Sequence, residues 1–315
     1  MRTVEHVVTG PRLKKTGILS SYWKYRSLVL LFLPAIIYYI LFKYLPIFGV
    51  QIAFKKYMFR MGIWGSPWIG FENFEKLFAM SSFWEVLRNT FIISGLKLLF
   101  GFPAPSVLAL LLNAIRNVVF KRMVQTISYL PHFLSWVILS GIFIQFLSPS
   151  IGPINILIKA MGGRPVYFLG EEEWFRTVLV VTHIWKSVGW GTIVYLAALT
   201  GINPEYYEAA YIDGATRWHC ARYITLPSLA PVITIMLIFA VGGIIDDDFN
   251  QIYNLYSEAV YSVGDVLSTY TYRRGLVKMD YGFASAVDLF KNVIAFVLII
   301  STNKIANHIN EYGIW

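Results

Sequence analysis

The sequence predicts an all-α protein that crosses a membrane several times. Apolar residues make up 57% of its 315 residues, charged residues only 14%, and the mean hydropathy is +0.57. A soluble domain carries about 25% charged residues. In addition, long apolar runs recur along the chain, and a membrane-spanning helix needs roughly 20 mostly apolar residues. We therefore expect a polytopic membrane protein.

Six runs are long and apolar enough to be spans. They lie at about 28–45, 89–113, 124–147, 178–200, 228–247 and 287–306. The preceding tail, residues 1–27, holds six Lys or Arg residues and one acid, and we expect no cleavable signal peptide there. Basic residues favour the cytoplasmic side of a membrane. This organisation, a tail at 1–27 and a membrane domain at 28–315, places both termini and the loop 201–227 in the cytoplasm.

Composition also limits the partners. The net charge is +9, but no basic stripe lies on a soluble segment, so orientation in a lipid bilayer explains this charge better than nucleic-acid binding. The 23 Phe, 20 Tyr and 10 Trp residues fit the aromatic belts of a bilayer. The single cysteine, Cys220, excludes an intrachain disulfide framework and a thiolate metal cluster.

The first outer segment, 46–88, contains a short amphipathic pattern. Phe71, Phe74, Leu77 and Phe78 fall on one face of a helix. Such a helix either lies flat in the outer interface or packs on the ends of the spans, and the pattern leaves both alternatives open.

Prolines are expected to distort the second span. Pro103 and Pro105 stand near its middle, and each removes a backbone donor and clashes with the preceding turn. A kink or break is therefore expected, and such helices usually line a cavity.

The fourth span carries the candidate substrate path, Trp185, Lys186, Trp190 and Tyr195, with His183 nearby. A lysine in a span costs roughly 2.5–3.5 kcal/mol on insertion scales, so it normally faces a cavity or a partner. Aromatic rings suit the apolar faces of sugars, and Lys can bind hydroxyls or a carboxylate. The alternative is that Trp185 and Lys186 are anchors at the outer interface.

Acidic residues elsewhere in the sequence give weaker indications of function. The run Glu171–Glu173 is typical of a solvated surface, and Asp246–Asp248 is either a solvated rim or a cation site. Asp288 and Lys291 have the spacing of an ion pair within one helix.

The polar loop 201–227 is predicted to form two short helices around a turn. Asn203 is a good N-cap, and Pro204 fits the first helical position. Gly214 can adopt the left-handed conformation that ends a helix, and Thr216 can cap a second one. A helical pair of this kind, exposing carboxylates and small residues, suits a groove in another protein.

This loop, with Glu208-Ala209-Ala210, Asp213-Gly214-Ala215 and Ile224-Thr225-Leu226-Pro227, resembles the EAA loop of bacterial ABC-importer permeases. Further segments resemble permeases for complex oligosaccharides, including uronate-containing ones. These segments are Tyr44-Leu45-Pro46, Gly70-Phe71-Glu72-Asn73-Phe74, Gly101-Phe102-Pro103-Ala104-Pro105, Tyr129-Leu130-Pro131-His132-Phe133-Leu134-Ser135-Trp136 and Tyr195-Leu196-Ala197-Ala198-Leu199.

The resemblance implies the partners and the mechanism. A second permease, expected to be a different chain in a heterodimer, would enclose the pathway with this one. Two ATP-binding subunits would lie beneath, and an extracellular solute-binding protein would deliver the oligosaccharide. The residues expected to couple to the ATPases are Glu205, Glu208, Ala209, Ala210, Asp213, Gly214 and Arg217. The expected location is the bacterial cytoplasmic membrane.

Other classes receive less support. The sequence has no G-x-x-x-x-G-K-[ST] loop, no metal-ligand spacing and no nucleophile motif, so we expect no catalysis, cofactor or metal in this chain. An ion-coupled secondary sugar transporter is the alternative. Such carriers usually place acids near the midplane, whereas the in-span charges here are mainly Lys43, Lys97, Lys186 and Lys291.

Overall fold

The computed structural model describes residues 25–245 and 248–310, with side chains in the last helix up to residue 308. Among these residues helices predominate, and the extended structure is an isolated bridge between Lys55 and Trp68. The all-α prediction is therefore confirmed for the described chain. Most of the basic tail, and Asp246 and Asp247 of the acidic triplet, lie outside the described residues.

The chain divides into two compact units between Gln51 and Ile52. In the first, α2 (Arg26–Tyr39) continues through the π-helical turn η1 (Ile40–Tyr44) into the 3₁₀ helix η2 (Leu45–Phe54), whose end enters the second unit. No residue of α2 is buried, and Leu31 is 79% exposed. Apolar side chains on every side suit a helix surrounded by lipid or by another membrane protein.

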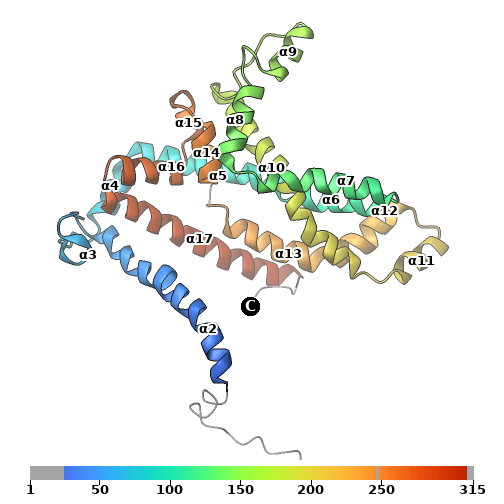
Figure 1. Cartoon of the computed structure of the whole chain (residues 1–315), viewed down its shortest axis with the longest axis horizontal. Helices are drawn as coiled ribbons and strands as arrows, with labels where there is room; N and C mark the ends of the chain where they lie inside the picture. The colour runs from blue at the N-terminus through green and yellow to red at the C-terminus, as the bar shows by residue number, and fades with distance from the viewer. Residues whose placement is uncertain (1–24, 246–247, 311–315) are drawn as a thin grey trace, which may run out of the picture. The chain divides into compact units, whose positions relative to one another are not determined.

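The second unit holds the remaining helices (Figure 1). Its longer ones are α5 (Ser81–Gly101), α6 (Pro103–Ala114), α7 (Val118–Tyr129), α8 (Trp136–Phe146), α10 (Glu172–Thr200), α13 (Leu226–Gly242) and α17 (Tyr281–Asn310). Its shorter ones are α3 (Gly62–Gly65), α4 (Glu72–Ala79), η3 (Leu130–Phe133), α9 (Pro153–Ala160), α11 (Glu205–Ile212), α12 (Arg217–Cys220), η4 (Ala221–Thr225), α14 (Phe249–Leu255), η5 (Glu258–Val260), α15 (Tyr261–Gly264), α16 (Leu267–Tyr272) and η6 (Arg273–Val277).

Four runs of the described chain are long and apolar enough to cross a membrane, namely Arg26–Phe54, Ser81–Ala114, Arg217–Gly242 and Tyr281–His308. A fifth results if α7–η3 and α8, which meet at an angle of 106°, form one span. These runs match five predicted spans, and each begins before its predicted start, because the helices continue into the segments that precede the apolar runs.

The predicted fourth span corresponds to α10, which has 29 residues but is not among these apolar runs. It contacts α5, α6, α7, α13 and α14, so other helices surround much of it. Thr182 and Thr192 are buried on it and bond to backbone carbonyls of the preceding turn. A helix enclosed by protein can carry polar residues that a lipid-facing helix cannot.

The prolines of the second span produce a local break. Helix α5 ends at Gly101, and α6 begins at Pro103 after the single residue Phe102. Both segments nevertheless continue as one 34-residue run. The carbonyl of Pro105 accepts a hydrogen bond from the Thr192 hydroxyl at 3.2 Å, which fixes α6 against α10 beside the break.

The amphipathic segment 71–78 forms α4, which packs against α17. Leu77 is fully buried, and the buried Asn73 amide donates to the carbonyl of Ala53 at 2.9 Å. Phe71 is 66% exposed and Phe78 42% exposed. A helix packed on the ends of the spans explains why Leu77 and Asn73 are buried. A helix lying flat in the outer interface would explain the exposure of Phe71.

Candidate functional site

The loop 203–227 forms the two expected helices, α11 and α12. The Asn203 side chain accepts from the backbone N–H of Glu205 at 3.1 Å, and α11 follows Pro204 directly. Gly214 has φ +81°, and the N–H of Ala215 reaches back to the carbonyl of Ala210 at 2.9 Å. A positive φ favours glycine, so the local sequence explains this turn.

The second helix is connected rigidly to a candidate span. Thr216 and His219 form a capping box at the start of α12. From Arg217 the chain stays helical through η4 and α13. The hydroxyl of Tyr207 bonds that of Thr225 at 3.0 Å and ties α11 to η4. A force on α11 or α12 would therefore reach α13 directly.

This helical pair presents a mixed surface. The predicted coupling residues Glu205, Glu208, Ala209, Asp213, Gly214 and Arg217 are exposed, and Ala210 is half-buried. Large apolar residues accompany them, since Ile212 is 87%, Trp218 70% and Tyr206 61% exposed. Exposed apolar groups rimmed by charges are typical of a protein contact surface.

Lys186 is hydrogen-bonded to three backbone carbonyls of the protein. Its ammonium donates to the carbonyls of Leu134 at 2.6 Å, His132 at 2.9 Å and Pro131 at 3.3 Å. These carbonyls lie at the bend between α7–η3 and α8, where the helical ladder is interrupted. A sugar carboxylate, the predicted ligand of Lys186, would have to replace these bonds in this conformation.

The other predicted path residues lie in different surroundings. Trp190 stacks on His132 with ring centroids 4.5 Å apart, and Trp185 contacts Phe143 edge-on. Tyr195 is only 2% exposed and packs in a core cluster with Leu199. Tyr195 is therefore packed in this conformation, and its place on the substrate path stays a prediction. Lys186 and Trp190 both contact His132, whereas Trp185 and Tyr195 contact other residues.

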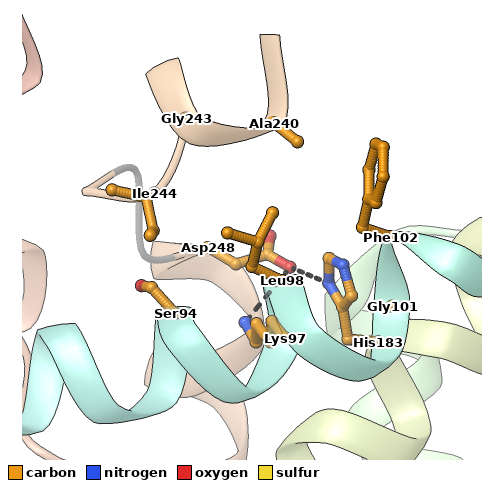
Figure 2. A pocket seen from close by; sticks show the side chains of 10 residues that line it. All are labelled: Ser94, Lys97, Leu98, Gly101, Phe102, His183, Ala240, Gly243, Ile244 and Asp248. Atoms are coloured by element: carbon orange, nitrogen blue, oxygen red, sulfur yellow. Dashed lines mark hydrogen bonds and ion pairs between the residues drawn. The ribbon is translucent and has the colours of Figure 1, made fainter. Parts of the chain in front are cut away.

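A charged cavity occurs instead between α5, α10 and the junction of α13 with α14 (Figure 2). It measures about 280 Å³. The Asp248 carboxylate lies 3.1 Å from Nδ1 of His183 and 3.6 Å from Nζ of Lys97. Lys97 is buried and Asp248 half-buried, and Ser94 adds a hydroxyl to the lining. Asp248 has φ +57°, which aspartate tolerates better than most residues.

Sequence reasoning did not bring these three residues together. Lys97 stood out as a charge in a span, but its partner Asp248 is 151 positions away, and no spacing rule connects them. The one available signal was that a lysine in a span requires a counter-charge or a cavity. Within the described ranges, no cluster of three or more His, Cys, Asp or Glu residues is arranged for a metal ion.

Comparison with known proteins gives a family. The family described as "Binding-protein-dependent transport system inner membrane component" matches residues 101–309. Protein LplB of Bacillus subtilis (strain 168) is 43% identical over 91% of each chain. The polygalacturonan/rhamnogalacturonan transport system permease protein YteP of the same organism is 39% identical over 96% of this chain and 94% of its own length.

Solved structures of ABC transporters are also similar to this chain. One is a bacterial alginate ABC transporter in complex with an alginate pentasaccharide-bound periplasmic protein. A chain of it superposes with a TM-score of 0.88 and 40% identity, over 94% of this chain and 99% of that one. A second structure, of a bacterial ABC transporter that imports the acidic polysaccharide alginate, gives a TM-score of 0.87 at 41% identity.

Proposed function

This chain belongs to the binding-protein-dependent transport system inner membrane components, and from this membership we propose that it imports acidic oligosaccharides as one half of an ABC-importer pore. The observation that carries the proposal is the agreement over 94% of the chain with a subunit of a transporter that imports an acidic polysaccharide. The family match over residues 101–309 includes the pair α11–α12 and, from the charged cavity, His183 and Asp248.

The chain is a permease subunit of the inner membrane, and separate subunits hydrolyse ATP. It works with a second permease, with ATP-binding subunits and with a solute-binding protein that delivers the sugar. The relatives supply the substrate class, because one transports polygalacturonan or rhamnogalacturonan and another structure carries an alginate pentasaccharide. All of these polymers contain uronate carboxylates, and Lys97 and His183 can bind such groups.

In this proposal six spans cross the membrane, with α10 as the polar, enclosed one and both termini in the cytoplasm. The exposed pair α11–α12 contacts an ATPase subunit. Glu208 makes the main polar contact, and Gly214 sets the angle between the two helices. Ile212 and Trp218 extend the same contact, as their exposure suggests.

Thiol labelling tests this topology. Cys220 is buried and would resist reagents on either side, so it should first be replaced by alanine. Val119 and Met161 are matched in exposure, at 78% and 80%. We expect an impermeant maleimide to label Met161→Cys in intact cells and Val119→Cys only after permeabilisation. The reverse pattern would contradict the proposed orientation.

Uptake by Lys97 variants tests the substrate class. Lys97→Met removes a buried cation from the cavity, so uptake of an oligogalacturonate should fall by about tenfold or more, as a charge-assisted hydrogen bond is worth ~1.5–3 kcal/mol. Uptake of a neutral oligosaccharide of equal length by the same transporter should fall less. Both are measured with the complete transporter in proteoliposomes.

The double variant Lys97→Met/Asp248→Asn distinguishes two roles of Lys97, namely binding the sugar and neutralising Asp248. It removes the cation together with its counter-charge, so the Asp248 carboxylate is not left with His183 as its remaining partner. We expect it to regain expression and neutral uptake but not acidic uptake. Full recovery of oligogalacturonate import would make Lys97 a structural ion-pair partner and would remove the cavity from the proposal.

A further inference from the structure

A second polar cavity, of about 430 Å³, lies among α14, α16, η6 and the first turns of α17. Its lining combines aromatic rings and small polar groups, including Phe249, Tyr272, Tyr281, Thr271, Ser285 and Asp288. This combination is chemically distinct from the charged cavity around Lys97. It is also distinct from a cavity of about 470 Å³ beside Trp185, whose lining is almost wholly apolar.

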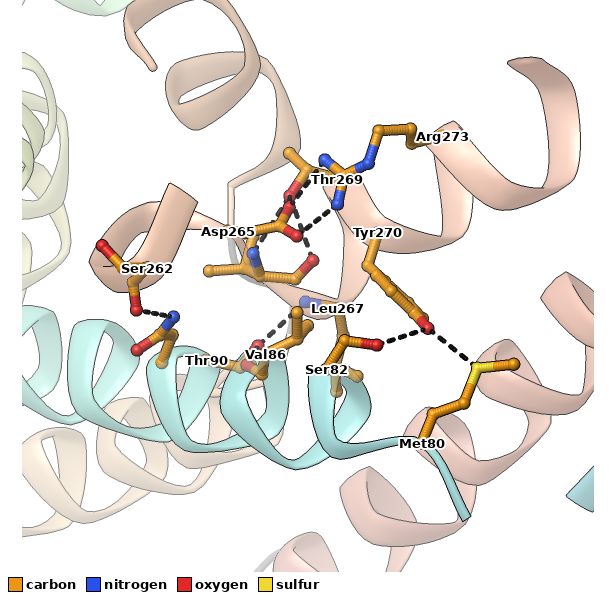
Figure 3. A network of polar contacts seen from close by, with 12 residues as sticks. Met80, Ser82, Val86, Thr90, Ser262, Asp265, Leu267, Thr269, Tyr270 and Arg273 are labelled. Atoms are coloured by element: carbon orange, nitrogen blue, oxygen red, sulfur yellow. Dashed lines mark hydrogen bonds and ion pairs between the residues drawn. The ribbon is translucent and has the colours of Figure 1, made fainter. Parts of the chain in front are cut away.

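Helix α16 has one face that a polar network anchors to its neighbours (Figure 3) and another face that lines the cavity. On the anchored face, the N–H of Leu267 donates to the Thr90 hydroxyl of α5 at 2.9 Å, and Thr269 bonds Asp265 at 2.8 Å. Arg273 forms an ion pair with the same carboxylate. Burial lowers the pKa of Arg273, but the hydrogen bond and charge of Asp265 outweigh it and hold the pKa above its usual value.

The opposite face of α16 carries Ser268, Thr271 and Tyr272, which line the cavity. Their spacing of three and four positions puts them on one side of the helix. The Thr271 hydroxyl is buried and has no hydrogen-bond partner among the described residues. Buried hydroxyls are normally bonded, but this one exposes no surface to the cavity, so the Ser285 hydroxyl is the one that faces a ligand in this conformation.

Aromatic rings connect this cavity to the surface. Phe249 and Tyr253 stack with centroids 5.0 Å apart and planes 18° apart, and Phe249 meets Tyr272 at 5.3 Å. Tyr253 is 40% exposed. A continuous series of rings therefore runs from an exposed tyrosine to the cavity lining.

Helix α14, which lines the cavity, follows the end of α13 that is opposite to α12 (Figure 1). If α11–α12 faces the ATPases, this is the extracellular end, where a delivered sugar arrives first. Aromatic faces stack on the C–H faces of sugar rings, while hydroxyls and carboxylates bond sugar hydroxyls.

We propose that this cavity is a saccharide-receiving subsite, in which Phe249 and Tyr272 stack on one sugar ring and Ser285 and Asp288 bind its hydroxyls. The proposal rests on the proposed function for the direction of transport. A lipid tail is a poor occupant, because Asp288 and three small hydroxyl residues line the space. The negative charge of Asp288 suits the hydroxyl-bearing side of a uronate ring rather than its carboxylate.

Paired ring variants test the stacking role in the complete reconstituted transporter. Tyr272→Phe keeps the ring, whereas Tyr272→Leu keeps apolar volume without it. The probe is a binding protein loaded with a galacturonate pentamer. For Tyr272→Leu we expect the half-saturating concentration to rise about three- to tenfold, which is the size of an aromatic contact, and for Tyr272→Phe no more than twofold. An equal response of the two variants would contradict stacking.

Saccharide protection provides a readout that packing alone would not change. In a Cys220→Ala background, Ser285→Cys lies in the cavity, and Ala259→Cys is an exposed control near the same end. Free galacturonate pentamer should slow the labelling of Ser285→Cys at least threefold and leave Ala259→Cys unchanged. Absence of this protection would overturn the inference. If the pentamer protects Ser285→Cys but neither the wild-type transporter nor any variant imports it, the proposed function is refuted and the subsite stands.

Discussion

Gly214→Val is expected to reduce substrate-stimulated ATP hydrolysis and uptake about tenfold or more while the protein still reaches the membrane. The backbone at Gly214 has φ +81°, and left-handed backbone costs an L-residue ~1–2 kcal/mol, with β-branched residues worst. The chain would relieve this strain by rotating α11 relative to α12. The contact surface formed by Glu208 and Ile212 would then no longer fit an ATPase.

Gly214→Asn is the matched control. An added Cβ at this position meets no atom within 4 Å, so only the dihedral angle opposes a side chain. Asparagine tolerates the left-handed region, and we expect Gly214→Asn to keep most of the coupled activity. Equal loss in both variants would show that the surface cannot accept any side chain. Normal stimulated ATPase activity in Gly214→Val would contradict the coupling role.

Lys186→Met is expected to lower the thermal stability of the complex and to reduce the uptake of acidic and neutral oligosaccharides equally. Its ammonium satisfies three carbonyls at the 106° bend between α7–η3 and α8. Leaving a polar group that is shielded from water unsatisfied costs ~1–3 kcal/mol, and these carbonyls are part-buried. The bend should therefore loosen.

Lys186→Arg retains a cation with several donors and should keep part of the stability, whereas Lys97→Met serves as the comparison for a selective, acidic-sugar defect. The measurements are the melting temperature of the detergent-solubilised complex and the uptake of both sugar classes. Selective loss of acidic uptake in Lys186→Met, at unchanged melting temperature, would return this lysine to the substrate path and contradict the structural role.

The sequence by itself determined the helical membrane class, most helix positions and the turn at Gly214. These features depend on local properties. Apolar runs of sufficient length must be helical in lipid because no water satisfies their backbone, and a glycine after a capped helix favours a left-handed residue. The limits of α11 agree with the sequence pattern for the same reason, since Asn203, Pro204 and Gly214 act within a few residues.

Tertiary structure alone decided what the polar residues of the spans contact. Lys97 lies in α5, His183 in α10 and Asp248 directly before α14, and periodicity shows which residues share a face of one helix but not which helices meet. For the same reason the sequence could not show that Lys186 completes the bend at Leu134 or that Tyr195 is buried beside Leu199. A charged or aromatic residue in a span requires a partner, and only the packing of the helices determines which partner it has.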